Sequence, residues 1–454
     1  WSNSNNWSLT SNTGPADTGG AVPGARDIVI IGGNDSIYLA TVLDTANRDV
    51  RSCSNLQIEG GSALDIGYNP ACIFSTVVSH SGGTNGNFRI ACDRGPLSGA
   101  TIRTFEFPGG DYTDYNTHLG TTELYTTNPT SGTTFYLPNG ITSYGNLIIS
   151  PLGGSNIIFP NHDLTIFGTL ITRGQNVNSW FCPSWNVDYP TAPVVRVAKT
   201  ITIMGNMDIQ GGALVWYGNG AITQNVVVNG NVVVASNSSI DVWDGATSQS
   251  LSIGGNLVNN TSGSGNERCD FTLLPVTFFG NTSASITNTM NNPVTILDRV
   301  TVNKGNSQLT TLTCNIGGTL TTLTDNWLIL QNGTFRYMRT DPATDFTIST
   351  TTPITIPATA GLSIDYANAN NRNILIGNAA NNSGDLLLDG KLTLIRGNVY
   401  IGPVAAPANN NDIEYSGGGA SAIDIQGGNL VVNGQIRRNT STTNGILNYT
   451  QSGG

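Results

Sequence analysis

One apolar frame recurs along this chain at a fixed interval. The stretch ITIMGNMDIQ (201–210) returns as VVVNGNVVVA (226–235) and again as LSIGGNLVNN (251–260), so that the aligned glycines, Gly205, Gly230 and Gly255, are evenly spaced. In each copy, apolar residues occupy every second position on both sides of the glycine, which is typical of a β-strand with one buried face. A self-similar period of about 20 to 50 residues indicates a repeat architecture.

The central glycine of the frame predicts a corner in the chain. A residue without a side chain suits a bend where two strand segments meet. We therefore expect an all-β chain folded as a right-handed parallel β-helix, a β-solenoid with inserted loops, whose coils stack at about 4.8 Å. Tandem β-sandwich domains would need a much longer repeat and hairpin turns. The glycines in this position are Gly168, Gly205, Gly230, Gly255, Gly280, Gly318, Gly390 and Gly427.

The regularity of the frame divides the chain into two regions. Residues 1–100 are less regular and are expected to form the start of the solenoid or a cap, whereas residues 101–454 are expected to form the β-helix repeats. The intervals 168–205 and 390–427 are equal to each other and longer than the basic repeat, which fits one coil with an inserted loop. The chain opens on Trp1 and closes on Gly454 within the pattern, so we expect it to be part of a longer polypeptide.

An insertion near 176–200 holds the densest aromatic group of the chain, in the stretch NSWFCPSWNVDYPTAP. Its rings could stack on sugars as a ligand-binding loop, or the loop could cover its own aromatics as a cap. The candidate ligand-binding residues are Trp180, Phe181, Trp185 and Tyr189. Elsewhere, Trp216 and Trp243 stand in nearly equivalent positions of neighbouring copies, as stacked coils require.

Charge and hydropathy exclude two classes of partner. Only 11% of the residues are charged, the net charge is −10, and the three lysines are scattered. A nucleic acid or an anionic membrane surface needs clustered basic residues, and the chain has none beyond the pair Arg437–Arg438. No apolar run approaches the roughly 20 residues of a membrane-spanning helix, so we expect no membrane insertion.

Metal and thiol chemistry is sparse in this sequence. The six cysteines form no CxxC pair, which argues against zinc. Cys53, Cys72 and Cys92 are almost evenly spaced, so a disulfide between two of them and reduced, buried thiols both stay open. Asp111 and Asp114 in DYTDYNTH, and the stretch NNNDIE (409–414), could each hold a structural Ca²⁺; no other cofactor is expected.

Parallel β-helices also include polysaccharide lyases and hydrolases, so catalysis has to be considered. Hydrolysis of a glycosidic bond uses two carboxyl groups on either side of it, one of them protonated. Asp111 and Asp114 are the nearest pair, in an irregular loop. Acids within the frame (Asp208, Asp241 and Asp424) take outward positions and are expected to be solvated surface. We therefore expect no enzyme activity.

Two stretches carry a family likeness. The opening WSNSNNWSLTSNTGPADTGGAVPGARDIVIIGG is followed by FRIACDRGPLSG, FPGGDYTDY, TTELYTTNP, YGNLIISPLGG and LTIFGTLIT in that order. With the repeats, these resemble the very large surface adhesins of Bacteroidota that the type IX secretion system exports, such as the gliding-motility adhesins of the SprB kind.

The resemblance implies a function but no catalytic residues. It implies a non-catalytic adhesin or stalk segment, extracellular and on the cell surface, which attaches to surface polysaccharide or a solid support. Its further partners would be the secretion and cell-surface anchoring machinery. A β-helix carbohydrate-active enzyme and a passive structural spacer remain the alternatives.

Overall fold

The structure of the protein is a computed structural model in which part of the chain is described. The described residues are 26, 28–38, 52–67, 72–80, 83–93, 97–98, 102–104, 107–127, 134–138, 140–184, 197–218, 222–243, 248–289, 292–339, 344–367, 372–379, 386–405, 410–416, 421–439 and 444–454. Two compact units are distinguished: unit 1 comprises 1–227 with 243–248, and unit 2 comprises 228–242 with 249–454.

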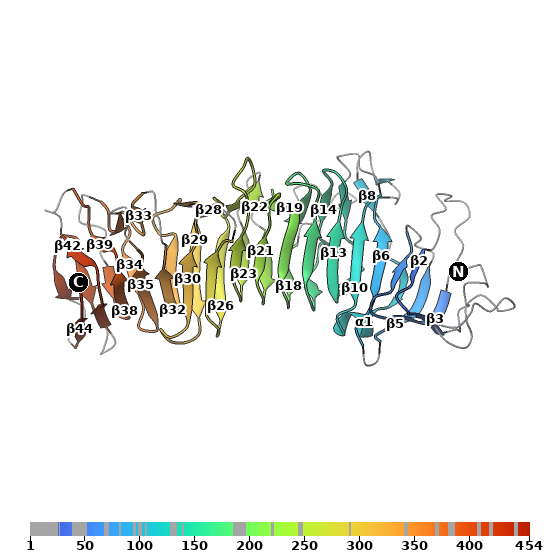
Figure 1. Ribbon diagram of the computed structural model, residues 1–454, viewed down its shortest axis with the longest axis horizontal. Helices are drawn as coiled ribbons and strands as arrows, with labels where there is room; N and C mark the ends of the chain where they lie inside the picture. Colours follow the sequence, from blue (N-terminus) through green and yellow to red (C-terminus); the bar gives the residue numbers. More distant parts are fainter. Residues whose placement is uncertain are drawn as a thin grey trace. The chain divides into compact units, whose positions relative to one another are not determined.

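Both units are built almost entirely from parallel strands (Figure 1). The strands form stacked coils of a β-solenoid, about 13 turns in all, so the predicted fold class is confirmed. One short helix, α1 (Thr113–Thr117), is described in unit 1. No helix among the described residues has the length and hydropathy that crossing a bilayer requires.

In unit 1 the strands form four parallel ladders, and at the end of one of them β7 (Leu97–Ser98) pairs antiparallel with β8 (Ile102–Thr104). One ladder is β1 (Ile28–Ile31), β3 (Ser52–Ile58), β5 (Ile73–Val78) and β9 (Gly109–Asp111). The longest is β2 (Ser36–Tyr38), β4 (Ala63–Asp65), β6 (Asn87–Ala91), β10 (Thr121–Tyr125), β13 (Asn146–Ser150), β16 (Leu170–Arg173) and β19 (Met207–Tyr217). The others are β8, β11 (Thr134–Tyr136), β14 (Asn156–Ile158), β17 (Trp180–Ser184) and β19, and β12 (Ser143–Tyr144), β15 (Leu164–Ile166), β18 (Lys199–Ile203) and β20 (Gln224–Val228).

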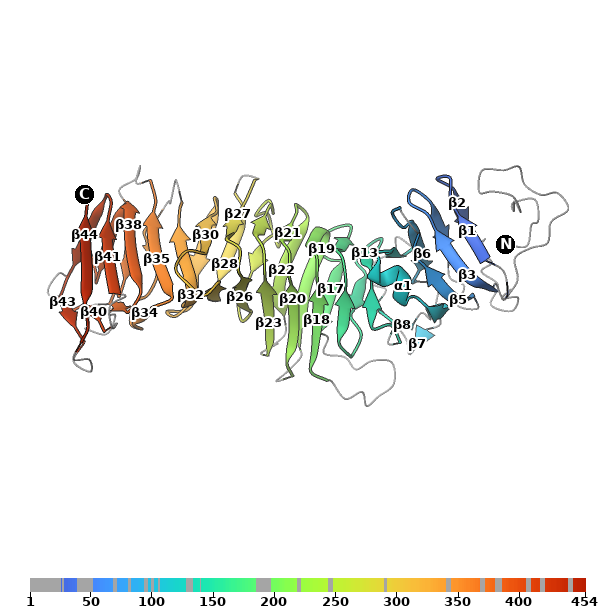
Figure 2. The same cartoon turned by 90° about the horizontal axis from the view of Figure 1, so that it is seen from below.

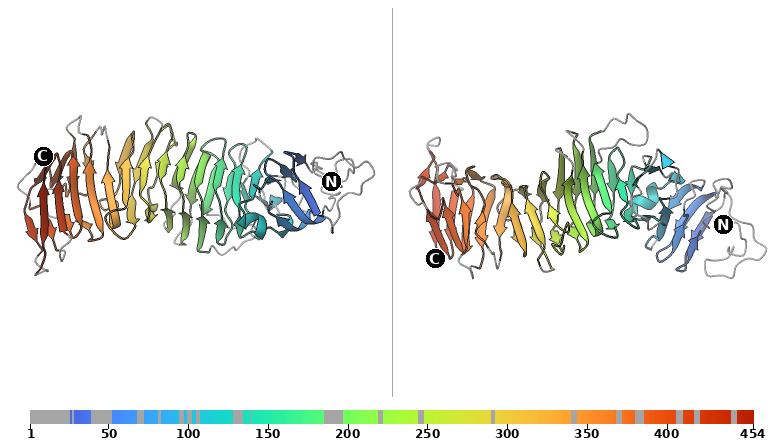
Figure 3. Two further views of the ribbon diagram at one scale, coloured as in Figure 1. Left: turned by 60° about the horizontal axis from the view of Figure 1, so that its bottom comes forward. Right: turned by 90° about the horizontal axis from the view of Figure 1, so that it is seen from above.

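Unit 2 has the same parallel arrangement, in five ladders (Figures 2 and 3). The longest is β21 (Val232–Val234), β24 (Leu257–Asn259), β27 (Ala284–Thr287), β30 (Thr311–Asn315), β32 (Leu328–Tyr337), β35 (Ala360–Asp365), β38 (Lys391–Arg396), β41 (Ser421–Ile425) and β44 (Leu447–Gln451). Two others are β23 (Gln249–Ile253), β26 (Pro275–Gly280), β29 (Arg299–Lys304) and β32, and β22 (Ser238–Trp243), β25 (Cys269–Asp270), β28 (Val294–Leu297) and β31 (Thr319–Thr322). The last two are β33 (Phe346–Thr347), β36 (Asn373–Ile376), β39 (Asn398–Ile401) and β42 (Asn429–Val432), and β34 (Ile354–Ile356), β37 (Leu386–Leu388), β40 (Ile413–Tyr415) and β43 (Ile436–Arg438).

The apolar positions of the frame stack in register from coil to coil. In unit 2, Leu251 of β23 pairs with Val276 of β26, which pairs with Val300 of β29. All three side chains are buried. Because successive residues of a strand point to opposite faces, this register keeps one face of each strand in the core.

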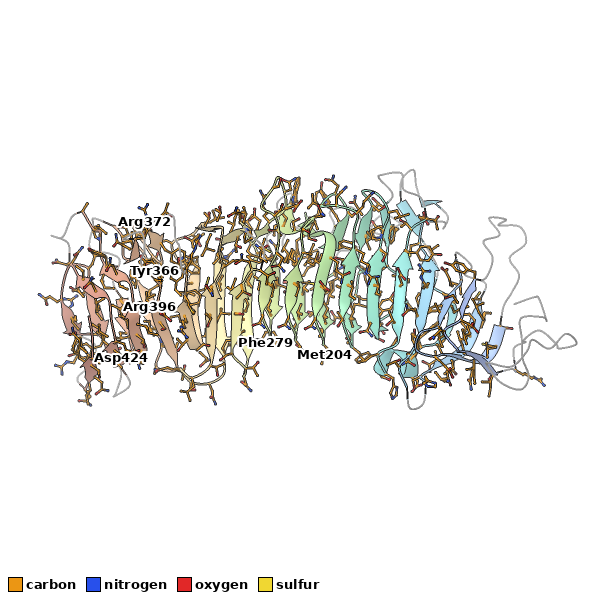
Figure 4. The ribbon with its side chains drawn as sticks, in the orientation of Figure 1. Met204, Phe279, Tyr366, Arg372, Arg396 and Asp424 are labelled. Carbon is orange, nitrogen blue, oxygen red and sulfur yellow. The ribbon has the colours of Figure 1, made fainter. Side chains whose placement is uncertain are left out.

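The frame glycines of unit 1 lie where neighbouring coils approach most closely. The N–H of Gly205 donates to the carbonyl oxygen of Gly168 at 2.9 Å, and that of Gly168 donates to Gly145 at 2.8 Å. A Cβ at Gly205 would lie 2.6 Å from the Gly168 oxygen. The glycine is therefore required for space between coils, while the preceding Met204 points outward and is 48% exposed (Figure 4).

In unit 2, Gly255, Gly318, Gly390 and Gly427 are in the same kind of contact, whereas a Cβ at Gly280 would come no closer than 3.8 Å to a neighbouring atom. Gly255 donates to the carbonyl oxygen of Gly230 at 2.9 Å, and Gly305, on the coil that follows Gly280, donates to Gly280 at 2.8 Å. A Cβ at Gly318, Gly390 or Gly427 would lie 2.7 Å or less from a backbone carbonyl oxygen. Of the eight frame glycines, only Gly280 and Gly318 also have a positive φ.

Asparagines beside these glycines bond one coil to the next. In unit 1 the side-chain oxygen of Asn146 accepts the N–H of Thr169 at 2.9 Å. In unit 2, Asn231 accepts the N–H of Asn256, which in turn accepts that of Ser285, both at 2.8 Å. These side chains satisfy amides at the corner, where the strand ladder is interrupted.

The six cysteines are all buried, and none is in a disulfide. Burial raises the pKa of Cys314 to about 12, although Arg339 lowers it. The open choice between a bridge and buried thiols at Cys53, Cys72 and Cys92 is thus resolved as thiols in this structure.

The ladders also bear on the regions expected from the sequence. Parallel pairing already begins with Ile28, which pairs with Asn55, so described residues before 100 take part in coils. Of the insertion near 176–200, residues 176–184 and 197–200 are described, and 185–196 lie outside the described residues.

Candidate functional site

Three aromatic side chains of unit 1, each at the end of a strand, meet on the outer face of the strands. The Trp180 ring at the start of β17 lies 5.7 Å from the ring of Tyr217 at the end of β19 and 5.3 Å from that of Trp243, measured between centroids. The interplanar angles are 40° and 46°, so the rings are tilted rather than stacked flat. Trp243 is 41% exposed, and Trp180 and Tyr217 are half-buried. We call these three residues the aromatic cluster.

A second apolar layer supports the aromatic cluster. Trp180 and Tyr217 pack against a group of buried side chains on one face of β11, β14, β17 and β19: Tyr136, Ile158, Cys182, Ala213 and Val215. Alternation along β17 places Phe181 on the opposite face, in register with Ile157 and Leu214. The rings of Trp180 and Tyr217 are therefore held in place by packing, and only their outer parts reach solvent.

The structure separates the four residues proposed for ligand binding. Trp180 belongs to the aromatic cluster, whereas Phe181 is fully buried and out of reach of a ligand, so that part of the prediction is wrong. Trp185 and Tyr189 lie outside the described residues. Tyr217 and Trp243 were not predicted as site residues.

The expected equivalence of Trp216 and Trp243 is also wrong. Trp216 is fully buried, and the N–H of Gly218 donates to the carbonyl oxygen of Trp243 at 3.1 Å, which places Tyr217 beside Trp243. Alternation along β19 places Ala213, Val215 and Tyr217 on the same face as Trp180, and Leu214 and Trp216 on the opposite face. The outward aromatic of that coil is therefore Tyr217.

Asp111 and Asp114 serve the loop around α1. A carboxylate oxygen of Asp114 accepts the N–H of Ser79 at 2.6 Å, and the other lies 3.2 Å from Nδ1 of His118. Asp111 accepts the N–H of Thr113 at 2.9 Å, and hydrogen bonds from Thr113 lower the pKa of Asp111. Among the described residues, no group of three or more His, Cys, Asp or Glu side chains is arranged to hold a metal ion.

The second stretch considered for Ca²⁺ is partly described. Asp412 and Glu414 both bond to Arg437, with 2.8 Å between Arg437 Nε and the Asp412 carboxylate. A carboxylate engaged by a guanidinium is a poor ligand for a cation. Asn409, the first residue of this stretch, lies outside the described residues.

A charged cluster in unit 1 joins residues that the sequence analysis did not connect. Arg89 on β6 lies between Asp65 on β4 and Glu123 on β10, at 3.1 and 2.8 Å. Its guanidinium carbon lies 4.8 Å from the centre of the Tyr125 ring, and the Tyr125 hydroxyl donates to Asp65 at 2.8 Å. Burial and Asp65 raise the pKa of Tyr125, so this phenol stays protonated.

The acids of the frame in unit 2 are paired as well. Asp241 is buried, 3.3 Å from Arg268, which also reaches Asp270 at 3.1 Å, so the expectation of solvated surface is wrong there. Asp424 on β41, which is labelled in Figure 4, bonds to Lys391 on β38 at 2.8 Å. In both pairs the basic partner lies on a neighbouring coil, so the pairing is not apparent from the linear sequence. In unit 1, Asp208 accepts from Gln210 at 2.7 Å.

Two buried lysines cap backbone carbonyls. In unit 1 the Lys199 ammonium donates to the carbonyl oxygens of Phe159 and Pro160 at 3.2 and 2.6 Å. In unit 2, Lys304 donates to Gly254 at 2.7 Å and to Phe279 at 2.5 Å. Burial lowers the pKa of Lys199 to about 7, although Cys182 raises it. These lysines satisfy carbonyls at coil corners and face away from solvent.

No protein-family model, no curated protein and no solved structure matches the chain.

Proposed function

We propose that this chain is a segment of a non-catalytic, extracellular adhesin or stalk that attaches to polysaccharide or to a surface. It would serve cell attachment or gliding motility as part of a longer cell-surface protein, in the manner of the adhesins it resembles. Secretion and anchoring would then fall to other parts of that protein.

The aromatic cluster carries this proposal. Tryptophan and tyrosine offer rigid, amphipathic contact area at low entropic cost, and the C–H faces of a sugar ring stack on such rings. Trp180, Tyr217 and Trp243 come from successive coils. Trp180 packs against both other rings, so the three rings form one compact group, and its exposed part, chiefly Trp243, offers a face on which a sugar unit could stack.

The pairing of the acids favours binding over catalysis. A glycoside hydrolase needs one protonated and one ionised carboxyl group beside the scissile bond. Asp65 and Glu123 lie on either side of Arg89 and both contact its guanidinium. Asp111 and Asp114 bind backbone amides. None of these four carboxyl groups is placed as a general acid facing a nucleophile.

Weak contacts suit a repeat scaffold. A single aromatic cluster offers modest affinity, but several copies of a segment on one cell surface raise the effective concentration of the remaining sites after the first has bound. A passive spacer needs no such cluster, so loss of binding on mutation of the cluster separates the two.

The test is binding and turnover on the same polysaccharides. Wild-type protein and Trp243→Ala are applied to a panel of neutral glycans, with retention and released products followed by mass spectrometry. We expect retention without products, and retention of Trp243→Ala that is weaker by about fivefold or more, taking for one ring the roughly 1–3 kcal/mol of a base stacked on an aromatic side chain. Trp243 is the most exposed of the three rings, so its loss should leave the fold intact.

Tyr449→Ala is the matched control, because Tyr449 is an exposed aromatic of unit 2, 51% accessible, outside the cluster. Equal retention of both variants and the wild type would reject the cluster as a binding site. No retention of any protein would favour the spacer, and released oligosaccharides would favour the carbohydrate-active enzyme.

A further inference from the structure

The arginine clusters of the described residues differ in their ratio of charges. In three of them one arginine is bound by two acids: Arg89 by Asp65 and Glu123, Arg268 by Asp241 and Asp270, and Arg437 by Asp412 and Glu414. In the fourth, the Asp365 carboxylate is bound by two arginines, Arg336 and Arg396. The first three carry one excess negative charge each, and the fourth carries one excess positive charge.

The backbone places the three residues of this fourth cluster in a row. Arg336 lies on β32, Asp365 at the end of β35 and Arg396 on β38, which are successive strands of one parallel ladder. A bulge between Ile364 and Asp365 brings Asp365 opposite Arg396. Nη2 of Arg336 contacts one carboxylate oxygen, and Nε of Arg396 contacts the other at 2.7 Å. One aspartate thus orients two guanidiniums on the outside of three coils.

Burial in the cluster is uneven. The Asp365 side chain is 4% exposed, whereas those of Arg336 and Arg396 are 36% and 52% exposed. Burial raises the pKa of Asp365, but the two guanidiniums together lower it by more, so that it lies below its ordinary value. The fixed negative charge lies underneath, and the positive groups face outward.

The two guanidiniums have hydrogen-bond donors to spare. Each carries five N–H bonds, and Asp365 takes one contact from each. Nε of Arg336 is buried and has no hydrogen-bond partner among the described residues. Planar guanidiniums bind carboxylate and sulfate or phosphate oxygens in a fork geometry.

We infer that the Arg336–Asp365–Arg396 cluster binds an oxyanion, and that its natural ligand is a carboxylate or sulfate group on an acidic polysaccharide. Asp365 is a positioning residue here, since it fixes both guanidiniums without contacting the ligand. The polysaccharide as carrier rests on the proposed function, whereas oxyanion binding rests on the cluster alone. Nearby, Lys391 and Asp424 form a neutral pair on β38 and β41 and add no net charge.

The experiment compares charged and neutral polymers on the whole chain. Retention is measured on dextran sulfate, unsulfated dextran, polygalacturonate and its methyl ester, at increasing salt. We expect the wild type to bind a charged polymer and not its neutral counterpart, and about tenfold weaker binding of Arg396→Gln, the loss of roughly one charged hydrogen bond. Arg336→Gln should weaken binding similarly.

Two further variants separate a built site from general electrostatics. Arg437→Gln removes the same charge from a cluster with excess acid and should bind as the wild type does. Arg396→Lys keeps the charge and loses the fork, so it should bind several-fold more weakly. Equal losses for Arg437→Gln and Arg396→Gln, full binding by Arg396→Lys, or no binding of the wild type to either charged polymer would each overturn the inference.

Competition by free sulfate identifies the group that is recognised. We expect millimolar sulfate to displace the polymer, and failure to do so at matched ionic strength with chloride would also overturn the site. Because Trp243→Ala is tested on neutral glycans, failure of the aromatic cluster and failure of the oxyanion site are read from different polymers. Circular dichroism of each variant checks that the fold is retained.

Discussion

The corner glycines make a quantitative prediction for Gly205→Ala. A Cβ at this position would lie 2.6 Å from the carbonyl oxygen and 2.9 Å from the carbonyl carbon of Gly168. Both are backbone atoms of the neighbouring coil and cannot rotate away. The same oxygen accepts the Gly205 N–H at 2.9 Å, so relieving the clash lengthens a hydrogen bond between coils.

The expected loss follows from three effects. Overpacking costs about 1–3 kcal/mol, and weakening the hydrogen bond costs about 0.5–1.5 kcal/mol. Alanine lowers the conformational entropy of the unfolded chain, which stabilises the folded state by about 0.4–1 kcal/mol. We therefore expect a net destabilisation of about 0.5–4 kcal/mol, with no contribution from a strained backbone, because the φ of Gly205 is not positive.

Gly140→Ala is the control in the same unit. A Cβ at Gly140 would meet no atom within 4 Å, and its φ is not positive. Only the unfolded-chain effect remains, so we expect this variant to be equal to or slightly more stable than the wild type. The two substitutions are chemically identical and differ only in the space that the neighbouring coil leaves.

The assay has to resolve local stability, because unfolding of a repeat array need not be two-state. Hydrogen exchange read by mass spectrometry over β15 and β18 reports the corner itself, and a loss of about 1.4 kcal/mol corresponds to a tenfold faster exchange. Urea unfolding supplies the global value. If Gly205→Ala exchanged and unfolded like Gly140→Ala, close approach of coils would not be the reason for the glycine.

Three further predictions concern the titration of two buried or bonded groups and the accessibility of the thiols. Backbone and hydroxyl groups of residues 350–352 donate hydrogen bonds to the Asp325 carboxylate. Burial raises the pKa of Asp325, but these donors lower it to well below the ordinary value, so the contribution of Asp325 to stability should be lost as the pH falls below about 4. The urea midpoint of Asp325→Asn should therefore depend less on pH in this acid range than that of the wild type. The pKa of Lys199 is about 7 in the folded chain, against an ordinary 10.5. Between these two pH values the unfolded chain binds more protons than the folded chain, so stability should rise with pH. Urea midpoints that change with pH in the same way for the wild type and Lys199→Met would contradict this. All six cysteines are buried, so iodoacetamide at pH 8 should label none before urea is added, and labelling of the native chain would refute their burial.

The ladder was predictable because its signal is local and repeated. Alternation around Leu251 and Ile253 is visible within a single short strand, and the same alternation recurs at Val276 and Phe278. Stacking at a constant interval then brings like residues together, as their register shows. The bonding of Asn231 to the next coil follows from the same repetition, since each copy supplies an amide at the same corner.

The aromatic cluster was only partly predictable, because its members are set by irregularities. Trp180 and Phe181 are adjacent, and strand alternation alone sends them to opposite faces, but no frame in that stretch shows which face is buried. In β19, Trp216 is buried and its neighbour Tyr217 lies beside Trp243. Residues 211–216 of this strand are all buried, so the apolar pattern does not show which of the two adjacent aromatic residues reaches the outer face.

The charged clusters could not be found from spacing. Arg89 lies 24 residues after Asp65 and 34 before Glu123, because the coils carry loops of different length. A slip of one residue would turn any of these side chains to the other face. Pairing across coils therefore becomes visible only when the register of every loop-bearing coil is known.

The composition of the chain makes the Arg336–Asp365–Arg396 cluster the least expected of these charged clusters. An outward charge in the middle of a stacked ladder has neighbours on two sides at about 4.8 Å. With 29 acidic and 19 basic residues, acids are the commoner neighbours, and an arginine between two acids is the arrangement that composition favours. An aspartate between Arg336 and Arg396 runs against it. Stacking would be served as well by one arginine, so the second guanidinium, half-exposed beside a charge already neutralised, argues for a ligand.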